Sequence, residues 1–310
     1  MGSTDSNSIQ LLIRFASPWR MVATVLLYCL GAGIVVYLGL SFDWINFWVG
    51  LSMLILLQIS SQYLRVYYDT FNPLQRRALP PRWQILEEEA QTPVDLTSER
   101  GILLPTALVT LSVGAVLTVL MQMRSPLSPA AFLLLGTAFM LAFIYSVPPF
   151  KLDETGYGEL IQAVLIVNLT PALAFIFQTG EFHRLIAMLT FPLLALFLAL
   201  QMVLGLPGFG RDLSAGRKNL IQQTGWERGV RLHHLLIVSC YLLLGLALLS
   251  GLPWRLTWPT LLSVPFAVYQ VMQMEQITTG AKPNWKLLTL NAVVTFGLVV
   301  YLMTFSLWVS

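Results

Sequence analysis

The chain has 310 residues, of which 56% are hydrophobic and only 11% are charged, and its net charge is +3. Soluble domains carry about 25% charged residues, so this composition excludes an ordinary soluble protein and indicates a membrane protein. The small positive charge gives no reason to expect a nucleic-acid partner, because basic residues of a membrane protein orient the chain and bind anionic lipid headgroups.

Nine segments are apolar enough to cross a bilayer, which takes about 20 residues per helix. They cover residues 21–40, 44–64, 102–123, 130–147, 160–177, 185–203, 232–249, 258–274 and 287–308. We therefore predict an all-α membrane protein with a single nine-helix transmembrane bundle over residues 18–310. Residues 1–17 are predicted to be a cytoplasmic tail without a cleavable signal peptide.

Basic residues are distributed very unevenly among the predicted loops. If the N-terminus lies inside, all but three of the 18 Lys and Arg residues fall on the inner side, and the three outer ones are Arg124, Arg184 and Arg255. Short cytoplasmic loops are enriched in Lys and Arg. The pattern predicts an inner-membrane protein of bacterial type, with the C-terminus outside and the loops after spans two, four and six facing the cytoplasm.

The second predicted span runs into a polar stretch at residues 58–73 (QISSQYLRVYYDTFNP). Arg65 and Asp69 lie one helical turn apart there. They either face a polar cavity, for which Gln62 is a further candidate, or form an ion pair on the protein surface.

The connection between spans four and five reads YSVPPFKL over residues 145–152. Its two prolines end a helix, and Lys151 is the only cation of the loop, so Lys151 is a candidate site residue. In the fifth span, Asn168 is polar at mid-membrane depth. It either lines a cavity or bonds two helices together.

Residues 204–220 (LGLPGFGRDLSAGRKNL) separate spans six and seven. Glycine and proline should end the incoming helix near Gly205. The polar loop that follows contains Asp212 among Arg211, Arg217 and Lys218. If the fold brings this loop to the end of the second span, the protein has one polar site at the membrane surface.

Together these strings resemble the UbiA superfamily of intramembrane aromatic prenyltransferases. Residues 145–152 are similar to a YSxPPxxLK-like segment of its quinone and chlorophyll branches. Residues 212–220 (DLSAGRKNL) are similar to a D-R-x-x-G-K-R-T-L segment, and residues 158–160 and 178–181 are similar to strings of the menaquinone branch. The resemblance implies a nine-helix bundle with an isoprenoid cavity.

The family resemblance also implies two aspartate-rich loops, N-D-x-x-D and D-x-x-x-D, which hold Mg²⁺ ions on an isoprenoid diphosphate. In this chain Arg65 and Val66 occupy the positions of the Asn and the first Asp of the former loop, and only Asp69 remains. In the latter loop only Asp212 remains. Asp69 and Asp212 together could hold one ion loosely, so no cofactor is assigned, and Mg²⁺ is expected only if the protein is catalytic.

Two hypotheses follow. In the first, the chain is a catalytically impaired homologue that binds a quinone, isoprenoid or pigment tail among the membrane lipids, or serves as an accessory subunit of a respiratory or photosynthetic membrane complex. In the second, it is an active transferase that moves a polyprenyl group from its diphosphate to an aromatic quinone or chlorophyll precursor. Under the second hypothesis the catalytic residues are Asp69, Asp212, Lys151 and Tyr145, and those that bind the diphosphate are Arg65, Arg211, Arg217 and Lys218.

Overall fold

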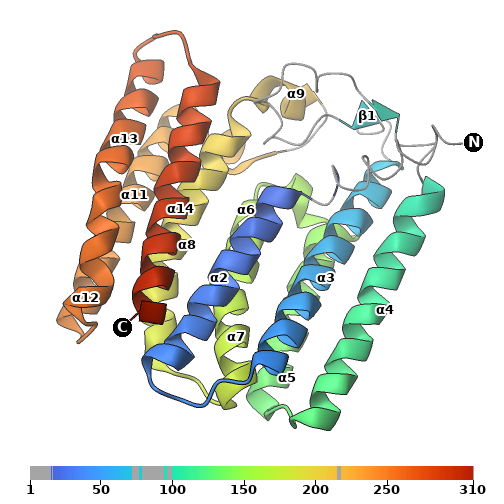
Figure 1. The fold of residues 1–310 in the computed structure, drawn as a ribbon. Coiled ribbons are helices and arrows are strands. Elements are labelled where there is room, and N and C mark those ends of the chain that lie inside the picture. The colour runs from blue at the N-terminus through green and yellow to red at the C-terminus, as the bar shows by residue number, and fades with distance from the viewer. Residues whose placement is uncertain are drawn as a thin grey trace, which may run out of the picture.

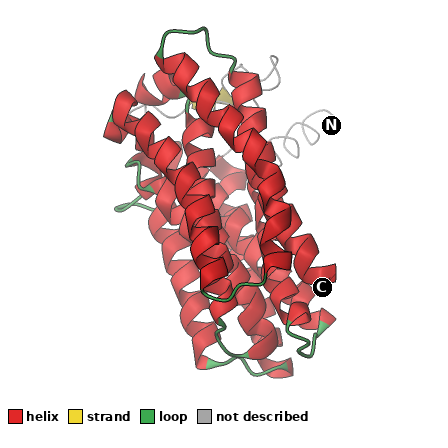
Figure 2. Ribbon diagram, turned by 90° about the vertical axis from the view of Figure 1, so that its left-hand side faces the viewer, coloured by secondary structure: helices red, strands yellow, loops and turns green. Residues whose placement is uncertain are grey.

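The computed structural model describes residues 15, 17–71, 77–78, 94–95, 100–214 and 218–309, with the backbone alone at residues 77–78, 94–95, 211–212 and 214. Their fold is a bundle of long helices that run up and down along a common direction (Figure 1). Figure 2 shows from the side that helix makes up almost the whole molecule, with loops at its two ends. The predicted all-α membrane fold is confirmed.

Eight helical segments of the described chain have the length and hydropathy to cross a membrane. They are α2 (Pro18–Tyr37), α3 (Trp44–Asp69), α4 (Arg100–Arg124), α5 (Pro129–Ser146), the continuous run of α6 (Gly158–Ala163), η4 (Val164–Leu169) and α7 (Thr170–Thr179), α8 (Arg184–Gly205), α11 (Trp226–Leu249) and α14 (Trp285–Val309). Each overlaps one predicted span. Helix α8 ends at Gly205, as predicted from the glycines and proline that follow.

The remaining predicted span, residues 258–274, lies in a run of three shorter elements, α12 (Trp254–Thr257), η5 (Trp258–Ser263) and α13 (Val264–Thr278). The first part of this predicted span is the 3₁₀ helix η5, which rises faster per residue than an α-helix. The other short elements join the long helices at their ends: β1 (Arg77–Ala78), β2 (Val94–Asp95), η3 (Leu152–Glu154), α9 (Phe209–Ser214) and α10 (Leu220–Thr224). Strands β1 and β2 form one antiparallel pair.

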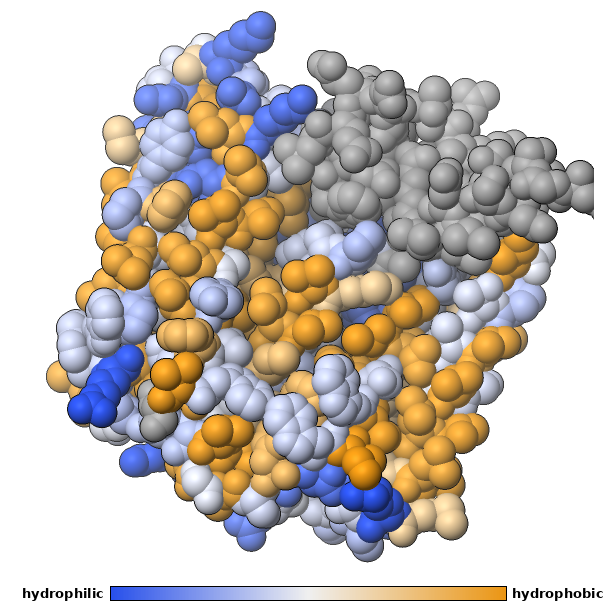
Figure 3. Space-filling model, in the orientation of Figure 1, coloured by the Kyte–Doolittle hydropathy of each residue, from blue (hydrophilic) through white to orange (hydrophobic). Residues whose placement is uncertain are grey.

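Apolar side chains cover the middle of the molecular surface. Figure 3 shows them as a broad band over the helices, with hydrophilic residues gathered toward the two ends of the bundle. Helix α4 contributes strongly to this surface, because large side chains such as Val109 and Met123 are 61% and 79% exposed. Such a surface suits hydrocarbon rather than water, so it agrees with a protein that spans the membrane several times.

Asp43 caps α3 at the end of the bundle opposite α9. Its Oδ1 accepts hydrogen bonds from Ile45 N at 2.7 Å and Asn46 N at 3.2 Å. Its Oδ2 accepts one from Arg124 Nη2 at 3.1 Å, at the end of α4. The hydrogen bond from Arg124, together with those from the two backbone N–H groups, lowers the pKa of the Asp43 carboxyl below its ordinary value.

Replacing Asp43 by alanine is expected to lower the free energy of unfolding by about 1 kcal/mol, the usual loss when a helix cap is removed. The substitution Asp43→Asn would retain the cap but not the charge. Since the folded pKa lies below the unfolded one, the charge contributes stability above about pH 3.9, and this stability is lost as pH falls through the lowered pKa. The melting points of wild type and Asp43→Asn in detergent should therefore converge on acidification. A difference that is independent of pH would contradict this.

Helix α2 lies against α7 without room for a side chain at Gly31. A Cβ atom there would lie 2.1 Å from the carbonyl oxygen of Pro171 and 2.6 Å from its Cα. Both obstacles belong to the backbone, so neither can turn away as a side chain would. Close approach of two helices at a small residue is typical of packing in membranes, where contact between the helices drives their association.

Gly31→Ala is expected to lower the free energy of unfolding by about 1–3 kcal/mol, because it forces α2 and α7 apart in a packed core. Gly136→Ala is the matched control, since an added Cβ on that part of α5 meets no atom within 4 Å. Thermal unfolding in detergent micelles measures both. If the two variants melt at the same temperature, the contact between α2 and α7 does not limit stability.

Candidate functional site

Three connections meet at one end of the bundle: the end of α3, the segment after α5, and the segment between α8 and α11 (Figure 1). Lys218 N donates a hydrogen bond to Glu154 O at 3.0 Å, and Thr155 and Lys218 form a parallel bridge. The side chains of Lys151 and Asp69 join the first two connections. The fold therefore brings together segments that lie up to 149 residues apart in the sequence, from Asp69 to Lys218.

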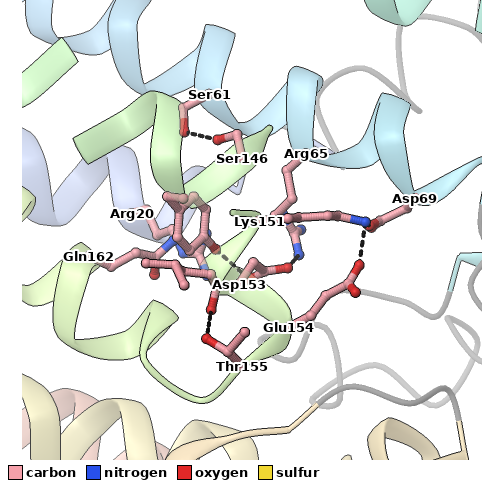
Figure 4. A network of polar contacts seen from close by, with 12 residues as sticks. Arg20, Ser61, Arg65, Asp69, Ser146, Lys151, Asp153, Glu154, Thr155 and Gln162 are labelled. Carbon is pink, nitrogen blue, oxygen red and sulfur yellow. Dashed lines mark hydrogen bonds and ion pairs between the residues drawn. The ribbon is translucent and has the colours of Figure 1, made fainter. Parts of the chain in front are cut away.

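Lys151 forms one half of a polar network at this end. Its Nζ lies 2.8 Å from Asp69 Oδ1 and also contacts Glu154 Oε1. The side chains of Lys151 and Asp69 are only 10% and 4% exposed. Lys151 adopts a left-handed backbone conformation, φ 36°, two residues after the second of the two prolines that follow α5. This turn directs the side chain of Lys151 toward Asp69 at the end of α3 (Figure 4).

Asp153 organises the other half of the network. Its Oδ2 lies 3.0 Å from Arg65 Nη1, and its Oδ1 accepts a hydrogen bond from Tyr145 OH at 2.7 Å. Arg20 Nη1 in turn donates to Tyr145 OH at 3.4 Å. Arg65 and Asp153 are 18% and 14% exposed, so this ion pair is partly shielded from water. Figure 4 shows these side chains converging from α2, α3 and the loop after α5.

These contacts form two neighbouring groups, and we call their seven residues together the ion cluster: Arg20, Arg65, Asp69, Tyr145, Lys151, Asp153 and Glu154. It contains three cations and three carboxylates, so with neutral tyrosine its formal charge is zero. Burying charges is unfavourable unless each one is paired, and here every carboxylate contacts a cation. Among the described residues the formal charges of the ion cluster therefore balance, and Arg20 contacts the hydroxyl of Tyr145 rather than a carboxylate.

The ion cluster unites four predicted site residues, Arg65, Asp69, Tyr145 and Lys151. The sequence spacing suggested a pair between Arg65 and Asp69, but each side chain contacts a partner in the loop after α5 instead. Asp69 is buried and the Arg65 side chain is only 18% exposed, so the two residues do not form an ion pair with each other on the protein surface.

The other predicted residues lie apart from these contacts or outside the described side chains. Lys218 borders the ion cluster through its backbone, while its side chain is exposed. Arg217 and the side chains of Arg211 and Asp212 lie outside the part of the chain that the structure describes. Asn168 Nδ2 donates to Thr190 Oγ1 at 3.0 Å and thus bonds η4 to α8. Its role in a cavity stays a prediction.

Sequence reasoning missed Arg20, Asp153 and Glu154. The last two directly follow Lys151-Leu152, and the signal that could have revealed them is charge balance, because a lone lysine in a buried loop needs a carboxylate nearby. No spacing rule points to Arg20, which lies 125 residues from its partner Tyr145.

A small cavity lies in the bundle interior. Eight residues line it: Thr24, Leu54, Leu57, Gln58, Ala138, Leu165, Thr170 and Leu173. It offers about 10 Å³ to the centre of a water-sized molecule, which is about the space of one water. The lining is mainly apolar, with polar groups from α2, α3 and α7. The larger isoprenoid cavity implied by the resemblance stays a prediction.

A magnesium site needs several oxygen ligands in a nearly octahedral arrangement. Among the described residues, no three Asp, Glu, His or Cys side chains are placed so that they could share an ion. The carboxylates of Asp69, Asp153 and Glu154 are held by Lys151 and Arg65. The described side chains therefore do not fit the pair of Mg²⁺ ions that the resemblance implies.

The fold and the site define a multi-pass helical membrane protein with a buried polar cluster at one end. The sequence matches the UbiA prenyltransferase family over residues 95–293. The chain belongs to this family.

A curated relative adds detail for part of the chain. Over 149 residues the chain is 32% identical to a 2-carboxy-1,4-naphthoquinone phytyltransferase from Synechocystis. The aligned region covers 46% of this chain and 47% of that protein, so the chain matches about half of the relative's length.

Solved structures share the fold over nearly the whole chain. A UbiA homologue from Archaeoglobus fulgidus, bound to GPP and Mg²⁺, superposes with a TM-score of 0.66 at 15% identity and covers 96% of this chain and 99% of its own. The structure of a digeranylgeranylglyceryl phosphate synthase superposes with a TM-score of 0.58 at 11% identity, covering 98% and 97%. At such low identity these matches establish the fold alone.

Proposed function

We propose that this chain is a divergent, catalytically impaired member of the family, which binds an isoprenoid-tailed molecule such as a quinone. It would act as a quinone-binding or accessory subunit of a respiratory or photosynthetic membrane complex. The observation that carries the proposal is the charge balance of the ion cluster, in which Lys151 and Arg65 are bound to carboxylates of the same cluster.

Cleavage of an allylic diphosphate requires that the charge of the leaving group be neutralised as it develops. A cluster with negative charge to spare could do this by holding metal ions, and one with free cations could do it directly. Lys151 and Arg65 cannot do this without breaking an ion pair, and Arg20, which contacts the Tyr145 hydroxyl, is a single cation. Separating Lys151 from Asp69, both largely buried, would itself raise the energy of the site.

Prenyl transfer to an aromatic acceptor is the second candidate, favoured by the identity with the Synechocystis phytyltransferase. In this case Lys151 and Arg65 would leave their carboxylates and bind the diphosphate, assisted by Arg211, Arg217 and Lys218. Tyr145 would stay hydrogen-bonded to Asp153. Catalysis would then rest on charge-assisted hydrogen bonds and on alignment of the two substrates.

Diphosphate release distinguishes the two candidates. The purified protein is mixed with phytyl diphosphate and a 2-carboxy-1,4-naphthoquinone, with and without Mg²⁺. We expect no release above that of heat-treated protein, and we expect mass spectrometry to find an isoprenoid quinone bound to the purified chain. Release that disappears in Asp69→Ala would instead establish the transferase.

We further propose that the ion cluster faces the cytoplasm. The three basic residues predicted outside, Arg124, Arg184 and Arg255, are at ends of α4, α8 and α12 remote from the ion cluster (Figure 1). Single cysteines at Lys282 and Arg255, in a chain without Cys29 and Cys240, would test this in intact cells. A membrane-impermeant thiol reagent should label position 255 alone. Labelling of position 282 alone would show that the protein has the opposite orientation.

A further inference from the structure

Helix α11 divides its residues sharply between two faces. The helix begins at the end of the bundle that holds α9 and runs to α12 at the other end (Figure 1). Its buried face packs mainly against α8. This face consists of Gly229, Val230, His233, Ile237, Cys240, Leu244 and Ala247. The opposite face of the helix is exposed from its first turns to its last.

The exposed face carries two arginines followed by apolar side chains. Arg228 and Arg231 are both exposed, and they are neighbours on the helix surface because they lie one turn apart. Large apolar residues then recur every three or four positions, each at least 50% exposed: Leu235, Val238, Leu242, Leu246 and Leu249. With about 100° between successive residues, all seven positions fall within about 80° of the helix circumference. We call these seven residues the α11 stripe.

The arginines at the head of the α11 stripe leave positive charge available. Neither guanidinium forms an ion pair with a carboxylate of the described residues. Glu227 directly precedes Arg228 and is also exposed. Its side chain leaves the helix about 100° away from that of Arg228, so this carboxylate lies beside the stripe rather than on it. Two cations against one carboxylate make the head of the stripe complementary to an anion.

The length of the stripe matches one leaflet of a bilayer. Leu242 lies 11 residues beyond Arg231, which is a rise of about 16 Å along the helix. Half of the hydrocarbon core of a membrane is about 15 Å thick. Trp226 begins the helix on the polar side of the arginines, and tryptophan is enriched where a membrane meets water. The arginines therefore lie at the level of lipid phosphates, and the apolar residues lie at the level of acyl chains.

We infer that the α11 stripe binds an anionic phospholipid. Arg228 and Arg231 hold its phosphate, since guanidinium groups bind phosphate through paired, charge-assisted hydrogen bonds. The acyl chains lie along the apolar residues from Leu235 to Leu242. A lipid of net charge −1 is favoured over phosphatidylcholine, because the choline cation would lie close to the two arginines. This site is on the outside of the bundle and does not depend on what binds within it.

A transmembrane helix of another protein suits the stripe less well. Close packing of helices in membranes uses small residues, which let two backbones approach each other. The five apolar residues of the stripe are instead four leucines and one valine. Such flexible, branched side chains suit fluid acyl chains, and the unpaired arginines need an anion that an apolar helix does not supply.

Titration of the full chain in detergent micelles with dioleoyl phosphatidylglycerol, read by native mass spectrometry, measures the affinity of the first bound lipid. Arg228→Gln and Arg231→Gln should each weaken binding about 5-fold, and the double variant about 30-fold, because each basic residue contributes separately to the attraction. Dioleoyl phosphatidylcholine should bind equally to wild type and variants. Without lipid all variants should melt like the wild type, since the arginines are exposed and form no ion pair with a described carboxylate.

Lys286→Gln is the matched control. It removes an exposed cation from the start of α14, at the same end of the bundle, and should weaken binding less than about 2-fold. A loss as large as that of the arginine variants would overturn the inference, since the attraction would then come from the charge of this whole end. Affinity that stays unchanged in the double arginine variant would overturn it too.

A photo-cross-linking amino acid at position 242 identifies what covers the stripe in the native membrane. We expect adducts with the mass of an anionic phospholipid, and fewer of them in the double arginine variant. Adducts with a second protein would overturn the inference in favour of a docked helix. Adducts in which anionic and zwitterionic lipids appear in the proportions of the bulk membrane would overturn it as well.

Discussion

Asp153→Ala is expected to lower the free energy of unfolding by about 3–5 kcal/mol, the usual loss when one partner of a buried ion pair is removed. The Arg65 guanidinium would lose the carboxylate that lies 3.0 Å away and would stay largely buried. Tyr145 OH would lose its acceptor at 2.7 Å as well. Chemical unfolding of the purified protein in mixed micelles measures the change.

The double variant Arg65→Met/Asp153→Asn is the control for this effect. It removes both charges and retains an oxygen that can accept from Tyr145 OH, so most of the lost stability should return. If the single variant loses less than about 1 kcal/mol, water reaches the pair in the folded protein, and the ion pair is no more than a surface contact.

Lys151→Met is expected to make the protein's stability depend on Mg²⁺. The lysine ammonium lies between Asp69 and Glu154, at a place where a metal ion would neutralise the same two carboxylates. Without metal we expect a loss of about 3–5 kcal/mol, because the two acids lose the cation that binds them. An ion present at 100 times its dissociation constant would restore about 2.7 kcal/mol.

Melting curves at increasing Mg²⁺ concentration test this effect, with the wild type and Lys218→Met as controls. The Lys218 side chain is exposed, so its loss should neither destabilise the protein nor create a dependence on Mg²⁺. A Lys151→Met protein that melts at the wild-type temperature, or whose melting temperature does not change with Mg²⁺, would show that the lysine does not occupy the position of a metal ion.

Both predictions concern contacts between distant segments, and these are the part of the site that the sequence could not reveal. Arg65 and Asp69 are one turn apart on α3, and local spacing alone suggested that they pair with each other. The loop after α5 supplies closer partners for both, since Asp153 and Lys151 flank Leu152 and contact different residues of α3. A pairing rule for one helix cannot take account of charges that the fold brings from another segment.

The helices themselves were far easier to predict. A hydrocarbon environment requires runs of about 20 apolar residues and ends them at polar, glycine or proline residues, so each span is marked locally in the chain. Helix α8 ends at Gly205 for this reason. The internal polar residues were less certain, since Asn168 could bond two helices or line a cavity, and only its contact with Thr190 shows that it joins η4 to α8.

The sequence by itself determined that this protein is an all-helical membrane protein, and its short motifs already pointed to the family that the comparison established. Hydropathy and motif strings are properties of neighbouring residues, so no folding is needed to detect them. Only the tertiary structure decided that charges from α3 and from the loop after α5 pair with one another at one end of the bundle. Coulombic pairing depends on separation in space, which packing of the helices sets and chain order does not.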